Sequence, residues 1–148
     1  VNTLFNRVFM ESMKIISASD NDELLTYFRD KGFNIKSEWK KLGINDKEQR
    51  KIMEEILAEL KLLINSNGIK KHIQTGNIND VCIVKIRIRN LKQKSGKWSG
   101  YRTYSLIISN QNLAILFDIY PKNGSNGKDN ISDTEKNKMK QIVNYFKN

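Results

Sequence analysis

The sequence is poor in the residues on which many enzyme classes depend: it has one histidine, one cysteine and one proline. His72 has no serine, cysteine or second histidine in a motif around it, so a hydrolase triad is not supported and a structural or exposed role is favoured. Cys82 lies in an apolar run, which is typical of a buried small side chain. Phosphate-binding loops and Gly-rich dinucleotide motifs are also missing. The sequence predicts neither a metal site nor a cofactor.

Long apolar runs are missing as well. No stretch approaches the roughly 20 apolar residues that cross a bilayer as a helix. The opening segment 4–16 is interrupted by Arg7, Glu11 and Lys14, and it lacks the uninterrupted apolar centre and small-residue cleavage site of a signal peptide. One cysteine cannot form an internal disulfide, which suits a reducing compartment. We therefore expect a cytoplasmic protein of 148 residues that makes no use of a membrane.

Acidic residues are scarce in the second half of the chain. Residues 1–60 contain 10 Lys/Arg and 11 Asp/Glu (net −1), whereas residues 61–148 contain 16 and 5 (net +11). The electrostatic field of such an excess of positive charge attracts a polyanion such as a nucleic acid. Charge alone equally fits a solvated surface that keeps the protein soluble.

Two helices are strongly indicated. Asn45 with Glu48, and Ser132 with Glu135, match the capping box that opens a helix. Apolar residues at spacings of three and four follow each box, and the first helix is expected to end at residues 65–68, with Gly68 available for a left-handed cap. Apolar residues within 4–16 also recur at helical spacing, and 24–28 form a second cluster that is helix or strand.

From Cys82 the apolar period changes to two, which predicts a strand. Residues 101–109 and 113–120 read as two more strands, joined by a tight polar turn at Asn110-Gln111. The sequence thus predicts an α+β fold in which helices pack against a small antiparallel β-sheet.

The stretch from Lys85 to Arg102 contains seven basic residues and no acid, with aromatic residues between them. Cations neutralise phosphates while aromatic rings stack on unpaired bases, so this mixture favours single-stranded nucleic acid. A solvated outer face of the sheet explains the alternation, but not the four further cations of the loop and the strand after it. The residues expected to contact RNA are Arg89, Lys92, Lys94, Lys97, Trp98, Tyr101, Tyr104 and Tyr120.

Several short strings, in this order along the chain, resemble the RelE/ParE-like toxin superfamily, and its HigB-type toxins in particular. They are residues 39–43 (WKKLG), 73–76 (IQTG), 85–88 (KIRI), 94–97 (KSGK), 99–102 (SGYR), 119–123 (IYPKN) and 129–132 (DNIS). The similarity runs over residues 36–148, which we take as the toxin-like domain. Residues 1–35 then form an N-terminal extension of the same domain.

The resemblance implies a type II toxin–antitoxin system in which the toxin is a ribosome-dependent endoribonuclease, or mRNA interferase. A ribose 2′-hydroxyl attacks the neighbouring phosphate and a 5′-hydroxyl leaves, without a metal. By the same resemblance Lys85, Arg87, Arg102 and Lys122 are the catalytic residues. Many members of the family have arginine near the position of Lys122, and lysine lacks the bidentate fork.

The implied partners are mRNA in the 30S A site and a helix-turn-helix (HigA-like) antitoxin, with promoter DNA bound only through the antitoxin complex. Two alternatives stay open on the same scaffold: a ParE-like toxin that inhibits gyrase, and a regulator that binds nucleic acid without cutting it.

Overall fold

The structure is a computed structural model that describes residues 12–89, 100–122 and 131–147. Its α-helices are α2 (Asp22–Asp30), α3 (Ile35–Leu42), α4 (Asp46–Asn65) and α5 (Asp133–Phe146). Its strands are β1 (Lys14–Ser17), β2 (Ile73–Gly76), β3 (Val81–Ile88), β4 (Tyr101–Ile108) and β5 (Leu113–Pro121). Three short 3₁₀ helices join them: η1 (Ala18–Asp20), η2 (Gly68–His72) and η3 (Ser109–Gln111). The predicted α+β class is confirmed.

The strands form one sheet in the order β1-β5-β4-β3-β2. β3, β4 and β5 pair antiparallel, as predicted. β2, which the sequence analysis did not predict, pairs antiparallel with β3, and β1 joins the other edge parallel to β5, so the sheet is mixed. The helical interpretation of residues 4–16 is therefore wrong for residues 14–16, which belong to β1, and residues 4–11 lie outside the described part of the chain. Apolar spacing in so short a segment fits both states, and the open edge of β5 decides between them.

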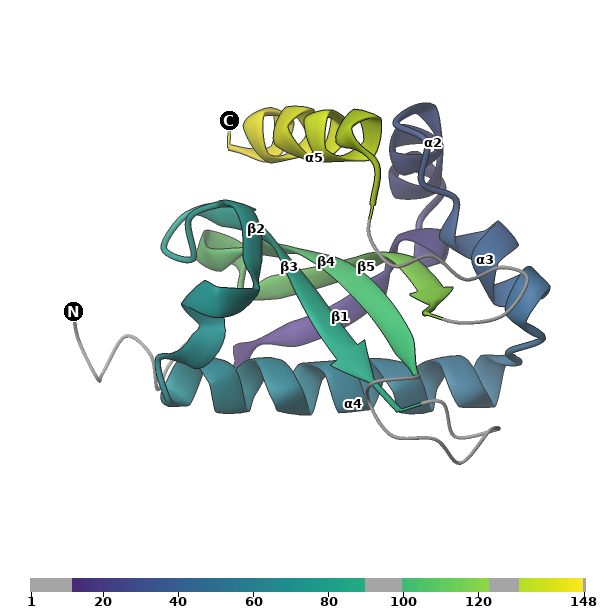
Figure 1. Cartoon of the computed structure of the whole chain (residues 1–148), viewed down its shortest axis with the longest axis horizontal. Coiled ribbons are helices and arrows are strands. Elements are labelled where there is room, and N and C mark those ends of the chain that lie inside the picture. Colours follow the sequence, from purple (N-terminus) through teal and green to yellow (C-terminus); the bar gives the residue numbers. More distant parts are fainter. Residues whose placement is uncertain (1–11, 90–99, 123–130, 148) are drawn as a thin grey trace.

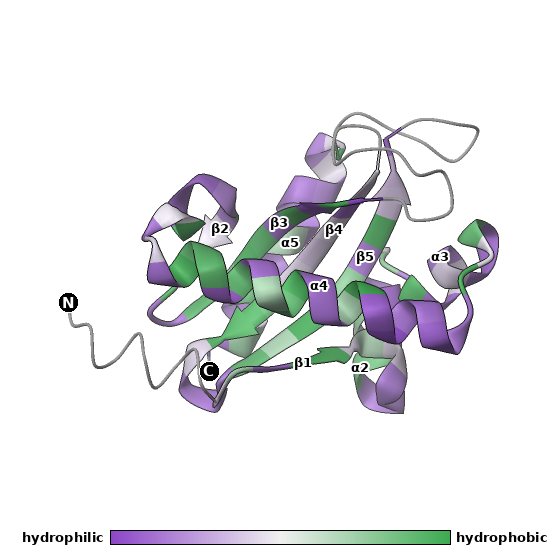
Figure 2. Cartoon of the chain, turned by 90° about the horizontal axis from the view of Figure 1, so that it is seen from below, coloured by the Kyte–Doolittle hydropathy of each residue, from purple (hydrophilic) through white to green (hydrophobic). Residues whose placement is uncertain are grey.

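Helices cover both faces of the sheet (Figure 1). α4 crosses one face and contacts β1 and β3, while α5 lies over β2 and β3 on the other face, beside α2. Viewed from the side of α4, apolar residues run along the strands behind the helix (Figure 2). With both faces covered, the three central strands are almost wholly buried. Alternation along a strand is then a weak guide to exposure.

Both predicted capping boxes are confirmed. The backbone N–H of Glu48 donates to Asn45 Oδ1 over 2.9 Å, and the backbone N–H of Asn45 donates to Glu48 Oε1 over 3.0 Å. At α5 the backbone N–H of Glu135 donates to Ser132 Oγ over 3.1 Å. α4 ends within the predicted region, but Asn67, with φ of 61°, takes the left-handed conformation expected of Gly68.

An irregularity in β5 ties the first part of the chain to the core. The register between β4 and β5 shifts after Tyr104, which leaves Phe117 with no residue opposite it. Its ring stacks on Phe28 of α2 at 4.9 Å between centroids and meets Phe33 edge-on at 5.0 Å. Phe28 and Phe117 are fully buried. A β-bulge of this kind turns a side chain toward a new partner.

Gly76 permits the close turn between β2 and β3. Its φ is +90°, and a Cβ placed there would collide with the carbonyl oxygen of Val81 and lie 2.7 Å from Cα of Cys82. Gly32 has nearly the same φ, +93°, but open space around it.

We expect Gly32→Ala to lower the free energy of unfolding by about 1–2 kcal/mol, the cost of backbone strain alone. Gly76→Ala should cost about 3 kcal/mol or more because it adds the collision. Urea unfolding of both variants measures the difference, and equal losses would contradict the described turn.

Candidate functional site

The register of the central strands gathers the basic residues of β3 and β4 on one face of the sheet. Arg87 pairs with Arg102, and Arg102 pairs with Tyr120 of β5. Two residues along, Lys85 pairs with Tyr104, and Tyr104 with Asp118. Directly paired residues point to the same side of a sheet, so all six side chains share a face. Charge interactions of Lys85 with Lys136, and of Tyr104 with Glu135, identify this as the face toward α5.

We define the cationic cluster as Lys85, Arg87, Arg102 and Lys136. Arg87 and Lys136 are exposed, Lys85 is half-buried and Arg102 is only 2% exposed. Like charges directly opposite each other on paired strands destabilise a sheet, and burying a guanidinium adds a desolvation cost. A cluster with this unfavourable arrangement is a candidate functional site.

The electrostatics of the cluster act most clearly on Lys85. Burial lowers the pKa of its ammonium, and the charges of Arg87, Arg102 and Lys136 lower that pKa further. A lysine with a lowered pKa is better able to accept a proton near neutral pH. Lys136 was not anticipated by the sequence analysis, because only the packing of α5 on β2 and β3 brings it close.

Tyr104 and Tyr120 form a buried pair beside the cluster, with Tyr104 opposite Lys85 and Tyr120 opposite Arg102. Their hydroxyl oxygens are 3.3 Å apart and their rings stack at 6.0 Å between centroids. The rings are 0% and 2% exposed, and burial followed by the hydrogen bond to Tyr120 raises the pKa of the Tyr104 hydroxyl. Asp118, opposite Tyr104 on the same face, is 6% exposed. The sequence analysis did not identify it as a site residue, although it is the one acidic residue in the apolar strand β5. The two tyrosines predicted to stack on RNA bases are thus covered, since both faces of the sheet carry helices.

Tyr101 lies on the other face of the sheet. It pairs with Ile88, is 4% exposed, and has its pKa raised by burial and by Glu48 of α4. It is therefore separated from the cationic cluster, because the alternation of β4 sends Tyr101 and Arg102 to opposite sides. A direct contact between Tyr101 and an RNA bound at the cluster is not supported.

The other expected residues lie near the end of the sheet or beyond the described chain. Arg89 follows β3 and is exposed. Lys122 follows β5, is half-buried, and its backbone N–H donates to the carbonyl of Gly100 over 3.2 Å. This bond holds Lys122 to the start of β4, at the same end of the sheet as Arg102. Four expected RNA contacts fall within residues 90–99, outside the described residues: Lys92, Lys94, Lys97 and Trp98.

His72 and Cys82 have structural surroundings. Nδ1 of His72 lies 3.2 Å from the carbonyl oxygen of Lys85, at the junction of η2 and β2. Burial raises the pKa of the Cys82 thiol to about 12, so the reactive thiolate is scarce at neutral pH. Within the described ranges, no group of three or more His, Cys, Asp or Glu residues could hold a metal ion.

Comparison with protein-family models, with curated proteins and with solved structures found no match to this chain. No helix in the described part of the chain combines the length and the apolar character needed to cross a membrane.

The lowered pKa of Lys85 can be tested by removing a neighbouring charge. Arg87→Gln should raise the pKa of Lys85 toward its ordinary value, because one cation that opposes protonation is lost. Arg50→Gln, an exposed change on α4 across the sheet, should leave it unchanged. An NMR titration of ¹³C-labelled lysine side chains measures both. The folded pKa lies below the unfolded one, so the stability penalty of the charged Lys85 is complete below the folded pKa and disappears as the pH rises to the unfolded value. A Lys85 pKa that is the same in both variants would contradict the assigned cause.

Proposed function

We propose that this protein binds single-stranded RNA at the cationic cluster and cleaves it, as a ribosome-dependent endoribonuclease and HigB-type toxin of a type II toxin–antitoxin system. The observation that carries the proposal is the position of Lys85, half-buried and with a lowered pKa, beside two arginines on the same face. The motif resemblance over residues 36–148 supports the same conclusion independently.

The proposed chemistry needs one proton acceptor and several fixed cations. Lys85, in its neutral form, takes the proton from a ribose 2′-hydroxyl as that oxygen bonds to the adjacent phosphorus. The bond from phosphorus to the 5′-oxygen breaks, and this oxygen leaves as a hydroxyl with a proton from Lys122 or from water. Arg87 and Arg102 stabilise the negative charge that builds on the phosphoryl oxygens. The products are a 2′,3′-cyclic phosphate and a 5′-hydroxyl.

A second candidate, binding of nucleic acid without cleavage, is favoured by one observation. Arg102 is 2% exposed, so its guanidinium reaches a phosphate only if neighbouring residues move. In that case Arg102 would act through the field it adds around Lys85 and Arg87 rather than by direct contact. The two candidates differ in whether strand scission follows binding.

The proposed partners follow from charge and from the resemblance. The net charge of +11 in residues 61–148 suits mRNA held in the 30S A site, since a polyanion is drawn to such a surface. It equally suits an acidic segment of a helix-turn-helix antitoxin that neutralises the toxin. We propose that promoter DNA is bound only by the complex of the two proteins.

Arg87→Ala tests the catalytic role, because Arg87 is exposed and its removal leaves the core intact. We expect at least ~100-fold slower cleavage of translated mRNA, the typical cost of one transition-state donor. The variant should remain folded, because Arg87 is exposed and does not contribute to the core. Arg102→Ala should lose a similar factor, provided circular dichroism shows that it folds. The control, Arg50→Ala on α4, should cleave normally. Full activity of a folded Arg87→Ala protein would contradict the proposal.

The dependence on the ribosome is tested in the same assay. The cationic cluster contains no acidic member, and Asp118 on the same face is only 6% exposed, so we expect the ribosome to supply the missing positioning of the RNA. Purified protein should leave naked RNA uncut and cut the same RNA when ribosomes translate it. Efficient cleavage without ribosomes would overturn this part of the proposal.

A further inference from the structure

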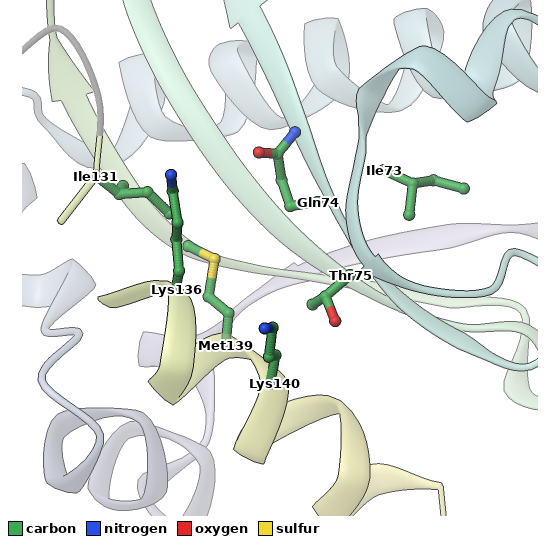
Figure 3. A pocket seen from close by; sticks show the side chains of 7 residues that line it. All are labelled: Ile73, Gln74, Thr75, Ile131, Lys136, Met139 and Lys140. Atoms are coloured by element: carbon green, nitrogen blue, oxygen red, sulfur yellow. The ribbon is translucent and has the colours of Figure 1, made fainter. Parts of the chain in front are cut away.

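A groove of about 360 Å³ lies between β2 and α5, beside the cationic cluster. β2 contributes Ile73, Gln74 and Thr75 from one side, and α5 contributes Lys136, Met139 and Lys140 from the other (Figure 3). Ile131, just before α5, completes the lining. The volume lies at the lower end of the range for small-molecule sites, which combine an apolar wall with a few fixed polar groups.

The groove adjoins the cationic cluster. Lys136 belongs to both, because it lines the groove and its charge acts on Lys85. Thr75 at the other wall pairs with Ile83, which lies two residues before Lys85 on β3 and points to the same face of the sheet. His72, which precedes Ile73, lies within hydrogen-bonding distance of the Lys85 carbonyl. A strand of RNA with a phosphate at Lys85 therefore has this groove as its immediate neighbour.

The chemistry of the lining suits one nucleotide. Ile131 and Met139 provide an apolar wall for the faces of a base, whereas the side chain of Ile73 points away from α5 (Figure 3). Gln74 donates through Nε2 to the His72 carbonyl over 3.1 Å, which leaves its Oε1 as an acceptor for a base N–H. Two ammonium groups, Lys136 and Lys140, line the groove, and none of its lining residues is acidic. Charge complementarity thus favours an occupant that carries phosphate.

We propose that this groove binds the nucleotide adjacent to the scissile phosphate of a single-stranded RNA, with Lys136 on the linking phosphate and Gln74 on the edge of the base. The inference rests on the proposed function for its substrate, and it adds a subsite that sets base preference. Lys136 is thereby a binding residue shared by the two sites, and Gln74 is the specificity-determining residue.

Binding of a non-cleavable RNA tests the groove without requiring catalysis. Short 2′-O-methyl oligonucleotides of each single base, labelled with fluorescein, are titrated with the full chain over a range of salt. Lys136→Ala should weaken binding about tenfold, since a charge-assisted contact is lost. It should also reduce the salt slope of log K by about 0.7, as one phosphate contact of a single strand does. Gln74→Met should leave the salt slope unchanged but reduce the differences in affinity among the four bases.

A charge-matched control lies on the same helix. Lys138→Ala removes one positive charge from α5 two residues away, on a different side of the helix, and should leave affinity and salt slope unchanged. Equal losses in Lys136→Ala and Lys138→Ala, or an unaltered base preference in Gln74→Met, would overturn the groove. Groove-dependent binding by a protein that never cuts translated mRNA would retain the groove and refute the nuclease. Normal cleavage of translated mRNA by both Lys136→Ala and Gln74→Met would retain the nuclease and refute the groove.

Discussion

The register between β3 and β4 is the constraint on which the candidate site depends. It sets Arg87 opposite Arg102 and Lys85 opposite Tyr104, and the register of β4 with β5 extends both rows to Tyr120 and Asp118. A slip of one residue would send every side chain of a strand to the other face and place Ile86 among the arginines. The apolar residues that alternate with the cations fix this register, because they fill the space between the sheet and α4. The core thus positions the charged face.

The same arrangement imposes an electrostatic cost. Paired arginines repel, and a buried guanidinium loses solvation. Burial of Lys85, and then the charges of Arg87, Arg102 and Lys136, lower the pKa of its ammonium. Helices α2 and α5 and the Phe28–Phe117 stack provide the apolar burial that offsets it. Strain of this kind in one place, within a core that otherwise packs well, is typical of a site retained for function.

The sequence predicted features that depend on neighbouring residues. Capping boxes at Asn45 and Ser132 and the alternation of β3 are local signals, and the structure follows them. β1 was missed because it exists only by pairing with a strand almost a hundred residues away. Lys136 was missed for a similar reason, since the packing of α5 places it beside Lys85. The burial of Tyr104 and Tyr120 escaped prediction because an alternating strand looks the same whether one face or both are covered.

The most direct test of the central claim is to map the 5′ ends of cellular transcripts shortly after the protein is induced. The account predicts new ends that carry a 5′-hydroxyl, that lie within translated regions, and that are absent when Lys85→Ala is induced to the same level. Lys85→Ala keeps the fold because Lys85 is only half-buried. Growth arrest without new ends, or the same ends with Lys85→Ala, would contradict an RNA-cleaving role for the cationic cluster.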